Sequence, residues 1–207
     1  MKYILTALIL ALLAGCFESK PKSTRYTQLV ELISTLQSAQ NADTAKLQAT
    51  YPQDLIDDAL ALRERAQSGG YTLITPRELS QQLDDYIIIA TMPRGIYNLG
   101  LIPNAKHFEF ALSPSLLPDG RAWDWHSDAL GRAQEEFIAL LGRDKNAKIV
   151  FYDTGEHILS PVGSAQVGLM WARHLGYTQL YRLVGGLNAW KDSSLPLSTQ
   201  APKCCQM

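Results

Sequence analysis

Two short, almost wholly apolar segments constrain the fold of this chain more than any other feature of its sequence. They are YIII at 86–89 and KIVFY at 148–152. Both are too short for ordinary helices, and unbroken apolar residues are typical of strands that are covered on both faces, as in parallel sheets. Within residues 71–198 such strands alternate with helical patterns, because a helix is predicted over 164–175 and a further strand over 179–184. The sequence therefore predicts one α/β domain with a mostly parallel sheet.

Local signals indicate where two of the helices begin. Thr75 can cap a helix whose first residue is Pro76, and Glu78 stands at the position that completes a capping box. Near the end of the domain, two consecutive glycines at 185–186 are predicted to turn the chain into a short last helix that carries Trp190.

A helical hairpin is predicted over residues 24–68, ahead of this domain. Apolar residues fall on one helical face between 24 and 39, and a second helical pattern begins near Asp43. Pro52 should interrupt the second helix, since a proline disfavours helical backbone in the residue before it. Two glycines at 69–70 should end that helix. We expect the hairpin to pack against the following domain; the alternative is a face that binds a partner.

The first sixteen residues differ in character from the rest of the chain. A short cationic start is followed by an apolar run at 4–13, too short to span a bilayer as a mature helix. LAGC at 13–16 resembles a lipobox, which implies a signal peptide at 1–15, lipidation of Cys16 and a tether at 16–23. The alternative is an ordinary secretory signal with a chance cysteine. The resemblance implies a lipid-anchored, periplasm-facing protein of the cell envelope, and Phe17 suggests the outer membrane.

Bulk composition argues against several other classes of protein. The formal net charge is −1 and no basic run occurs, so no nucleic-acid partner is expected. The three cysteines, Cys16, Cys204 and Cys205, all lie outside the predicted core. A fold held by disulfides would need cysteines spread through the domain. The domain is therefore predicted to be held together by packing alone.

Several segments of the predicted domain form an ordered series. They are TPREL at 75–79, IATMP at 89–93, GLIPNA at 100–105, LGY at 175–177, LVGGLNAW at 183–190 and LP at 195–196. In this order and spacing, they resemble the rhodanese-like family. The resemblance implies a five-stranded parallel sheet with helices on both faces. It also implies an active-site loop after a central strand, where sulfurtransferases of the family carry a nucleophilic cysteine.

At the position of that cysteine this chain has Asp153. Sulfur transfer requires a thiolate in an anion-binding loop, and a carboxylate cannot form a persulfide. The phosphatase branch of the family needs the same cysteine and an arginine in the loop, yet no Lys or Arg occurs between Asp153 and Ser164. The first box also departs from active members at Ala90, Met92 and Leu101. The loop that corresponds to the active site contains Asp153, Thr154, Gly155, Glu156, His157, Ser160 and Ser164.

Other chemistry for this loop has little support in the sequence. Asp153, Glu156 and His157, with His107 or His126, could be imagined as metal ligands, but no spacing typical of a metal site occurs. We therefore predict no metal and no cofactor. His157 could relay a proton, although Ser160 beside it has no evident orienting partner.

Two further groups of residues leave alternatives open. Trp123 and Trp125, in an insertion at 113–126, could line a recognition surface, although half-buried packing is the commoner outcome. In the tail at 199–207, Cys204 and Cys205 could carry sulfur or a soft metal.

We predict a membrane-anchored, non-catalytic rhodanese-like module that binds an envelope protein or a small anion. The alternative prediction is a periplasmic sulfurtransferase or sulfur carrier that uses Cys204 or Cys205.

Overall fold

The computed structural model describes residues 24–38, 44–97, 100–115, 123–156 and 163–199. The signal peptide, Cys16 and the tail thiols lie outside the described residues, as do His157 and Ser160 of the loop.

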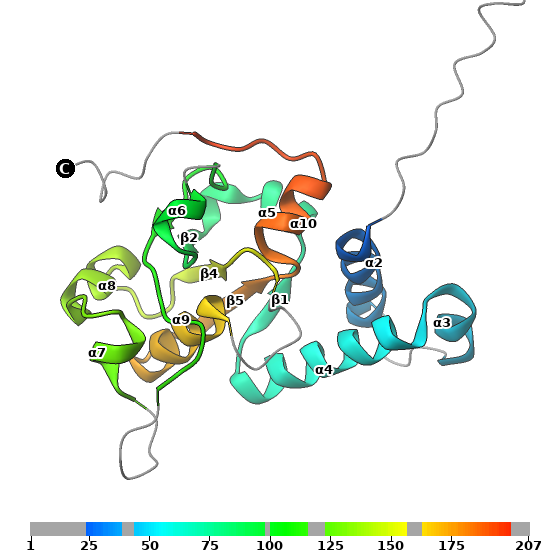
Figure 1. Ribbon diagram of the computed structural model, residues 1–207, viewed down its shortest axis with the longest axis horizontal. Helices are drawn as coiled ribbons and strands as arrows, with labels where there is room; N and C mark the ends of the chain where they lie inside the picture. Colours follow the sequence, from blue (N-terminus) through cyan, green and yellow to red (C-terminus); the bar gives the residue numbers. More distant parts are fainter. Residues whose placement is uncertain (1–23, 39–43, 98–99, 116–122, 157–162, 200–207) are drawn as a thin grey trace, which may run out of the picture.

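Five parallel strands form one sheet in the order β1-β5-β4-β2-β3 (Figure 1). The strands are β1 (Thr72–Ile74), β2 (Ile87–Ala90), β3 (Lys106–His107), β4 (Lys148–Tyr152) and β5 (Gln179–Leu183). The predicted five-stranded parallel sheet is confirmed, and the two apolar segments are the strands β2 and β4. β4 is the middle strand of the sheet. Ligands of open α/β sheets bind at the carboxyl ends of such strands, so the residues after β4 hold a central position.

In the described part of the chain, seven short helices connect or follow the strands. They are α5 (Pro76–Ser80), the 3₁₀-helix η1 (Leu83–Asp85), α6 (Arg94–Tyr97), α7 (Trp125–Asp128), α8 (Gln134–Leu141), α9 (Ser164–His174) and α10 (Gly186–Asp192). The predicted capping box is present at the start of α5, where the Thr75 hydroxyl accepts from the Glu78 N–H and the Glu78 carboxylate accepts from the Thr75 N–H. The predicted last helix is α10.

The hydrophobic core forms two layers, one on each face of the sheet. Along β4, Ile149 and Phe151 face one layer, to which α8, α9 and the N-terminal helices contribute. Val150 and Tyr152 face the other layer, with residues of α5 and α10. Because successive side chains of a strand point to opposite faces, this alternation explains why all four residues at 149–152 are apolar.

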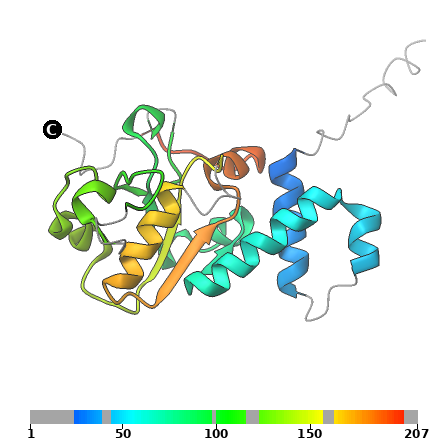
Figure 2. The ribbon, with the colours of Figure 1, turned by 60° about the horizontal axis from the view of Figure 1, so that its bottom comes forward.

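The N-terminal hairpin consists of α2 (Arg25–Ser38), α3 (Thr44–Thr50) and α4 (Gln53–Gly69). The predicted second helix is interrupted at Pro52, as expected, and forms two helices, α3 and α4. Gly70 ends α4 in the left-handed conformation, with φ 65°. Figures 1 and 2 show the hairpin at one end of the sheet. No helix in the described part of the chain is long and apolar enough to cross a membrane.

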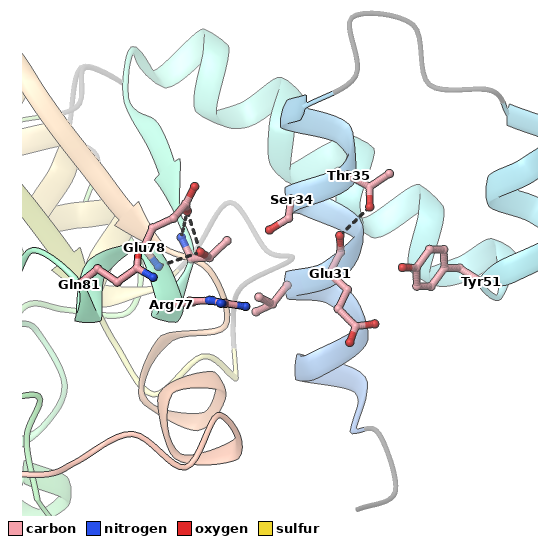
Figure 3. A pocket seen from close by; sticks show the side chains of 9 residues that line it. Glu31, Ser34, Thr35, Tyr51, Arg77, Glu78 and Gln81 are labelled. Atoms are coloured by element: carbon pink, nitrogen blue, oxygen red, sulfur yellow. Dashed lines mark hydrogen bonds between the residues drawn. The ribbon is translucent and has the colours of Figure 1, made fainter. Parts of the chain in front are cut away.

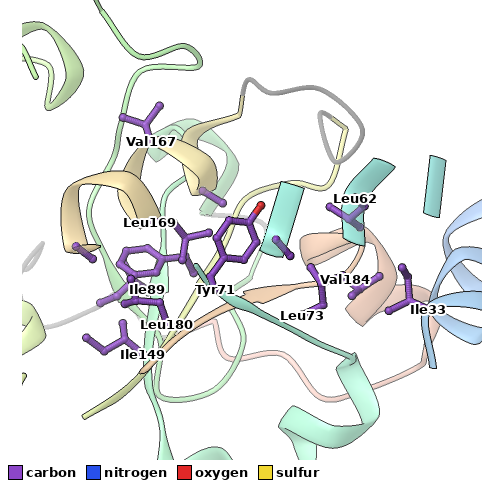
Figure 4. Packing of buried hydrophobic residues seen from close by; sticks show 14 of the residues in the cluster. Ile33, Leu62, Tyr71, Leu73, Ile89, Ile149, Val167, Leu169, Leu180 and Val184 are labelled. Carbon is purple, nitrogen blue, oxygen red and sulfur yellow. The ribbon is translucent and has the colours of Figure 1, made fainter. Parts of the chain in front are cut away.

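The hairpin packs on the domain, in agreement with the expectation from its apolar face. Ile33 and Leu62 belong to the same buried cluster as Leu73 and Val184 of the sheet region (Figure 4). Polar contacts fix the same interface, because the Asn188 side-chain amide donates to the Tyr26 hydroxyl at 3.1 Å. The hairpin therefore shares the core of the α/β domain.

Candidate functional site

The segment that follows β4 is held rigidly by the start of α10. The N–H of Leu187 donates to the Asp153 carbonyl at 2.9 Å, and the N–H of Asn188 donates to the Thr154 carbonyl at 3.0 Å. Gly155 adopts φ 96°, and a Cβ at that position would lie 2.1 Å from the Gly185 carbonyl oxygen. Only glycine can hold the chain this close to the neighbouring turn in this conformation.

Asp153 is the first residue of the loop after β4, and it is buried, with only 7% of its surface exposed. Its Oδ1 accepts the N–H of Gly155 at 2.9 Å, and its Oδ2 accepts the N–H of Ala165, in the first turn of α9, at 3.3 Å. The residue before α9, Gly163, has no side chain to cap the helix. Asp153 therefore supplies the negative charge and the acceptor that the start of a helix favours.

A buried arginine on β5 neutralises this carboxylate. The Arg182 side chain is 2% exposed, and its Nη2 lies 3.8 Å from Asp153 Oδ2. Its Nη1 donates to Gln166 Oε1 at 3.3 Å, and the same oxygen accepts the Tyr71 hydroxyl at 2.9 Å. A charge this deeply buried is tolerated only when it is paired, so Asp153 and Arg182 are mutually dependent.

The other side of the loop rests on hydroxyl groups. Thr91 Oγ1 lies 2.9 Å from Ser164 Oγ and donates to the Tyr152 carbonyl at 3.0 Å. The Tyr152 phenol oxygen accepts the N–H of Ile102 at 3.2 Å, and complete burial raises the pKa of this tyrosine. Tyr152 is therefore a neutral structural group under Asp153.

A small cavity of about 120 Å³ opens beside Asp153. It is lined by Met92, Pro93, Ile96, Leu112, Asp153, Thr154, Glu156 and Ser164. Four of these side chains are apolar, and the two ionisable ones are both carboxylic acids. The cavity thus combines an apolar wall with hydrogen-bond acceptors.

The comparison with known proteins identifies the family. Residues 75–193 match the profile of the rhodanese-like domain. This chain belongs to the rhodanese-like family. The match covers more than half of the 207 residues and ends one residue after α10. No curated protein matches the chain.

Solved structures with similarity to this rhodanese-like chain come from several organisms. A rhodanese-related protein of Thermoplasma volcanium is 12% identical, with a TM-score of 0.43, over 63% of this chain and 100% of that one. A 3-mercaptopyruvate sulfotransferase of Escherichia coli is 24% identical, with a TM-score of 0.45, over 63% of this chain and 51% of that one. The polysulfide-sulfur transferase homodimer of Wolinella succinogenes is 17% identical, with a TM-score of 0.42, over 76% of this chain and 93% of that one.

The rhodanese-like domain brings together five of the predicted loop residues. Asp153, Thr154, Glu156 and Ser164 line the cavity, and the N–H of Gly155 donates to the Asp153 carboxylate. The residue that sequence reasoning missed is Arg182. No clear signal for it is present in the sequence, because an arginine in the alternating strand predicted over 179–184 normally faces solvent.

His107 and His126, the candidate metal ligands that the sequence offered beside the loop, lie outside the cavity lining. His107 is fully buried and its Nε2 donates to the Met92 carbonyl at 2.7 Å, while burial lowers its pKa. His126 is exposed, and neither histidine lines the cavity. Across the described ranges, no group of three or more His, Cys, Asp or Glu side chains could hold a metal ion.

The two tryptophans of the insertion of this rhodanese-like chain differ in role. Trp125 begins α7 and packs against the core, with its Nε1 donating to the Arg132 carbonyl at 2.6 Å. Trp123 is 40% exposed and stacks on His174 with ring centroids 4.1 Å apart. Trp125 is therefore a packing residue, and only Trp123 presents its ring to the surface.

A larger hollow of about 590 Å³ lies between α2 and α5 and is lined by residues such as Glu31, Tyr51 and Arg77 (Figure 3). It shares no lining residue with the cavity beside Asp153. The loop after β4, at the position that the family's active-site loop occupies, therefore remains the candidate functional site.

Proposed function

We propose that this chain is a lipid-anchored, non-catalytic rhodanese-like module that acts as a binding or accessory component of the cell envelope. The observation that carries the proposal is the position of the Asp153 carboxylate and the groups that hold it. The carboxylate stands directly after the middle strand and is held by two backbone N–H groups and by Arg182.

This arrangement argues against sulfur transfer at the loop. In an active member of the family the loop N–H groups would stabilise a thiolate and its bound sulfur. Here the N–H groups of Gly155 and Ala165 already donate to Asp153. The loop therefore lacks the nucleophile, and two of the N–H donors in its described part are already engaged by Asp153.

The proposal is tested by sulfur transfer from thiosulfate to cyanide, measured as thiocyanate. The chain from residue 17 onward keeps every described residue, and it is compared with its Cys204→Ser/Cys205→Ser variant and with an active rhodanese. We expect no turnover above the uncatalysed rate for either form of the chain. Turnover that disappears in the double variant would support the alternative function at the tail thiols. Turnover that persists in the double variant would refute the assignment of a non-catalytic loop.

The anchor is a separate part of the proposal and rests on the LAGC sequence at 13–16. Two or more acyl chains on Cys16 would hold the protein at a membrane, whereas one chain binds only marginally. We expect the wild-type chain expressed in a two-membrane bacterium to sediment with the outer membrane, and a Cys16→Ser variant to leave the membrane fraction. Release of the wild-type chain, or unchanged sedimentation of the variant, would contradict lipid anchoring.

A further inference from the structure

We infer that the cavity beside Asp153 binds a lysine side chain of a partner protein, so that a site whose family counterpart handles anions here receives a cation. The inference rests on the proposed function, because it requires that the loop performs no sulfur chemistry. It adds the chemical class of the group that is recognised.

The first argument is the hydrogen-bonding character of the cavity. The N–H groups of Gly155 and Ala165 both donate to Asp153. The Ser164 hydroxyl is engaged with Thr91. An anion entering the cavity would meet the carboxylate oxygens of Asp153 and Glu156, whereas an ammonium group needs only acceptors.

The second argument is charge. Asp153 and Glu156 are the ionisable side chains of the lining. Arg182 lies beneath the loop and offsets one of these two charges. Glu156 is exposed, and no described cation forms an ion pair with it. Among the described residues that line it, the cavity thus keeps one uncompensated negative charge, which a single ammonium group would balance.

The third argument is shape and the nature of the wall. Met92, Pro93, Ile96 and Leu112 form an apolar wall, and the volume of about 120 Å³ corresponds to about four water molecules at ~30 Å³ each. A lysine side chain combines a flexible four-carbon stem with a compact charge. Its stem would contact the wall while its ammonium group reaches the carboxylates. A planar guanidinium requires a wider, bidentate partner.

The mouth of the cavity favours a lysine on a protein over a free amine. The Leu112 side chain is 51% exposed at the rim, and Pro93 beside it is also exposed. Exposed apolar side chains around a pocket provide contact area for a protein surface. A free alkylamine would use the cavity alone and leave this rim uncovered.

Methyl NMR of the full chain in mild detergent tests the inference, because Met92 lines the cavity. The chain contains four methionines, and labelling their methyl groups gives one reporter in the cavity and Met170 on α9 as an internal control. The probe is Nα-acetyl-lysine methylamide, and the matched control is Nα-acetyl-norleucine methylamide, which has the same stem without the ammonium group. We expect the lysine compound to shift the Met92 signal saturably and to leave Met170 unchanged, and the norleucine compound to bind at least about fivefold more weakly.

A variant at Glu156 tests the role of the negative charge and leaves the buried pair of Asp153 and Arg182 intact. Glu156→Gln should weaken binding of the lysine compound by about two- to fivefold, as expected for loss of one exposed carboxylate. Glu135→Gln, which removes an exposed acid on α8, should leave it unchanged. Equal effects of the two compounds, an equal loss in both variants, or no shift of Met92 would each overturn the inference. A Met92 shift with thiosulfate but not with the lysine compound would also overturn it.

These outcomes are separable from failure of the proposed function. The same samples are examined for thiocyanate formation, so an active loop would be detected whatever the binding result. Inactivity together with absent lysine binding would leave the non-catalytic assignment intact and remove only the assignment of the ligand.

Discussion

Replacing Arg182 with methionine should destabilise the protein strongly, because it leaves the Asp153 carboxylate buried without a countercharge. Methionine keeps most of the aliphatic stem, so the change removes mainly the guanidinium. The 3.8 Å separation between Nη2 and Oδ2 corresponds to about 4 kcal/mol of attraction at an effective dielectric constant of about 20. Removal of one partner of a buried pair typically costs ~3–5 kcal/mol. Asp153 keeps its two backbone N–H donors, so we expect a loss near the lower end, about 3 kcal/mol.

The assay is urea unfolding of the wild type, Arg182→Met, Asp153→Asn and the double variant. The double variant contains neither charge, so it should be more stable than the sum of the two single losses predicts, with a coupling energy of about 2–3 kcal/mol. The exposed pair of Arg132 and Glu136, whose side chains approach to 2.9 Å, is the matched control. Its cycle should give less than about 1 kcal/mol. A loss below ~1 kcal/mol for Arg182→Met, or a coupling no larger than that of the surface pair, would refute the reasoning.

Three further predictions concern the surroundings of the loop. Tyr152→Phe removes the acceptor of a buried backbone N–H and should cost about 1–3 kcal/mol in the free energy of unfolding, measured by urea titration; an unchanged midpoint would contradict it. Gly155→Ala should lower the melting temperature markedly, since its Cβ would meet a carbonyl oxygen, whereas Gly95→Ala, with open space around its Cβ, should not; equal effects would show that the close approach is unimportant. Burial lowers the pKa of His107 in the folded protein from its ordinary value of 6.5. As the pH falls, the histidine of the unfolded chain is therefore protonated first, which favours unfolding. The free energy of unfolding should thus be highest above about pH 6.5 and decrease below it. Urea midpoints between about pH 7.5 and 5.5 should show this loss, and His107→Gln should reduce it; an identical slope in the variant would assign the effect to other groups.

The central part of the fold could be predicted from the sequence because it depends on local, periodic signals. The segment 148–152 is apolar at positions that face both core layers, which only a central strand requires. Pro52 and the capping residues Thr75 and Glu78 act within one turn of the chain, so their effects could be predicted without tertiary information. The strands β1 and β3 are two or three residues long, too short for a periodic pattern.

The position of the candidate site could be predicted from the sequence, but the buried countercharge of Asp153 could not. Asp153 follows an apolar strand, and its place in the loop follows from the family resemblance. Its partner Arg182 lies 29 residues later along the chain, and only strand pairing between β4 and β5 brings the two together. An arginine within an alternating strand normally indicates a solvent-facing side chain, and the burial of Arg182 depends on α9 covering that face of the sheet.

The most direct test of the central claim, that this chain carries no working sulfur nucleophile, is intact-mass spectrometry after incubation with thiosulfate. The samples are the reduced chain from residue 17 onward and its Cys204→Ser/Cys205→Ser variant, under conditions that load an active rhodanese with sulfur. The account predicts an unchanged mass for both. A stable gain of one sulfur atom by the wild-type chain that disappears in the double variant would contradict it, because a tail thiol would then carry transferable sulfur.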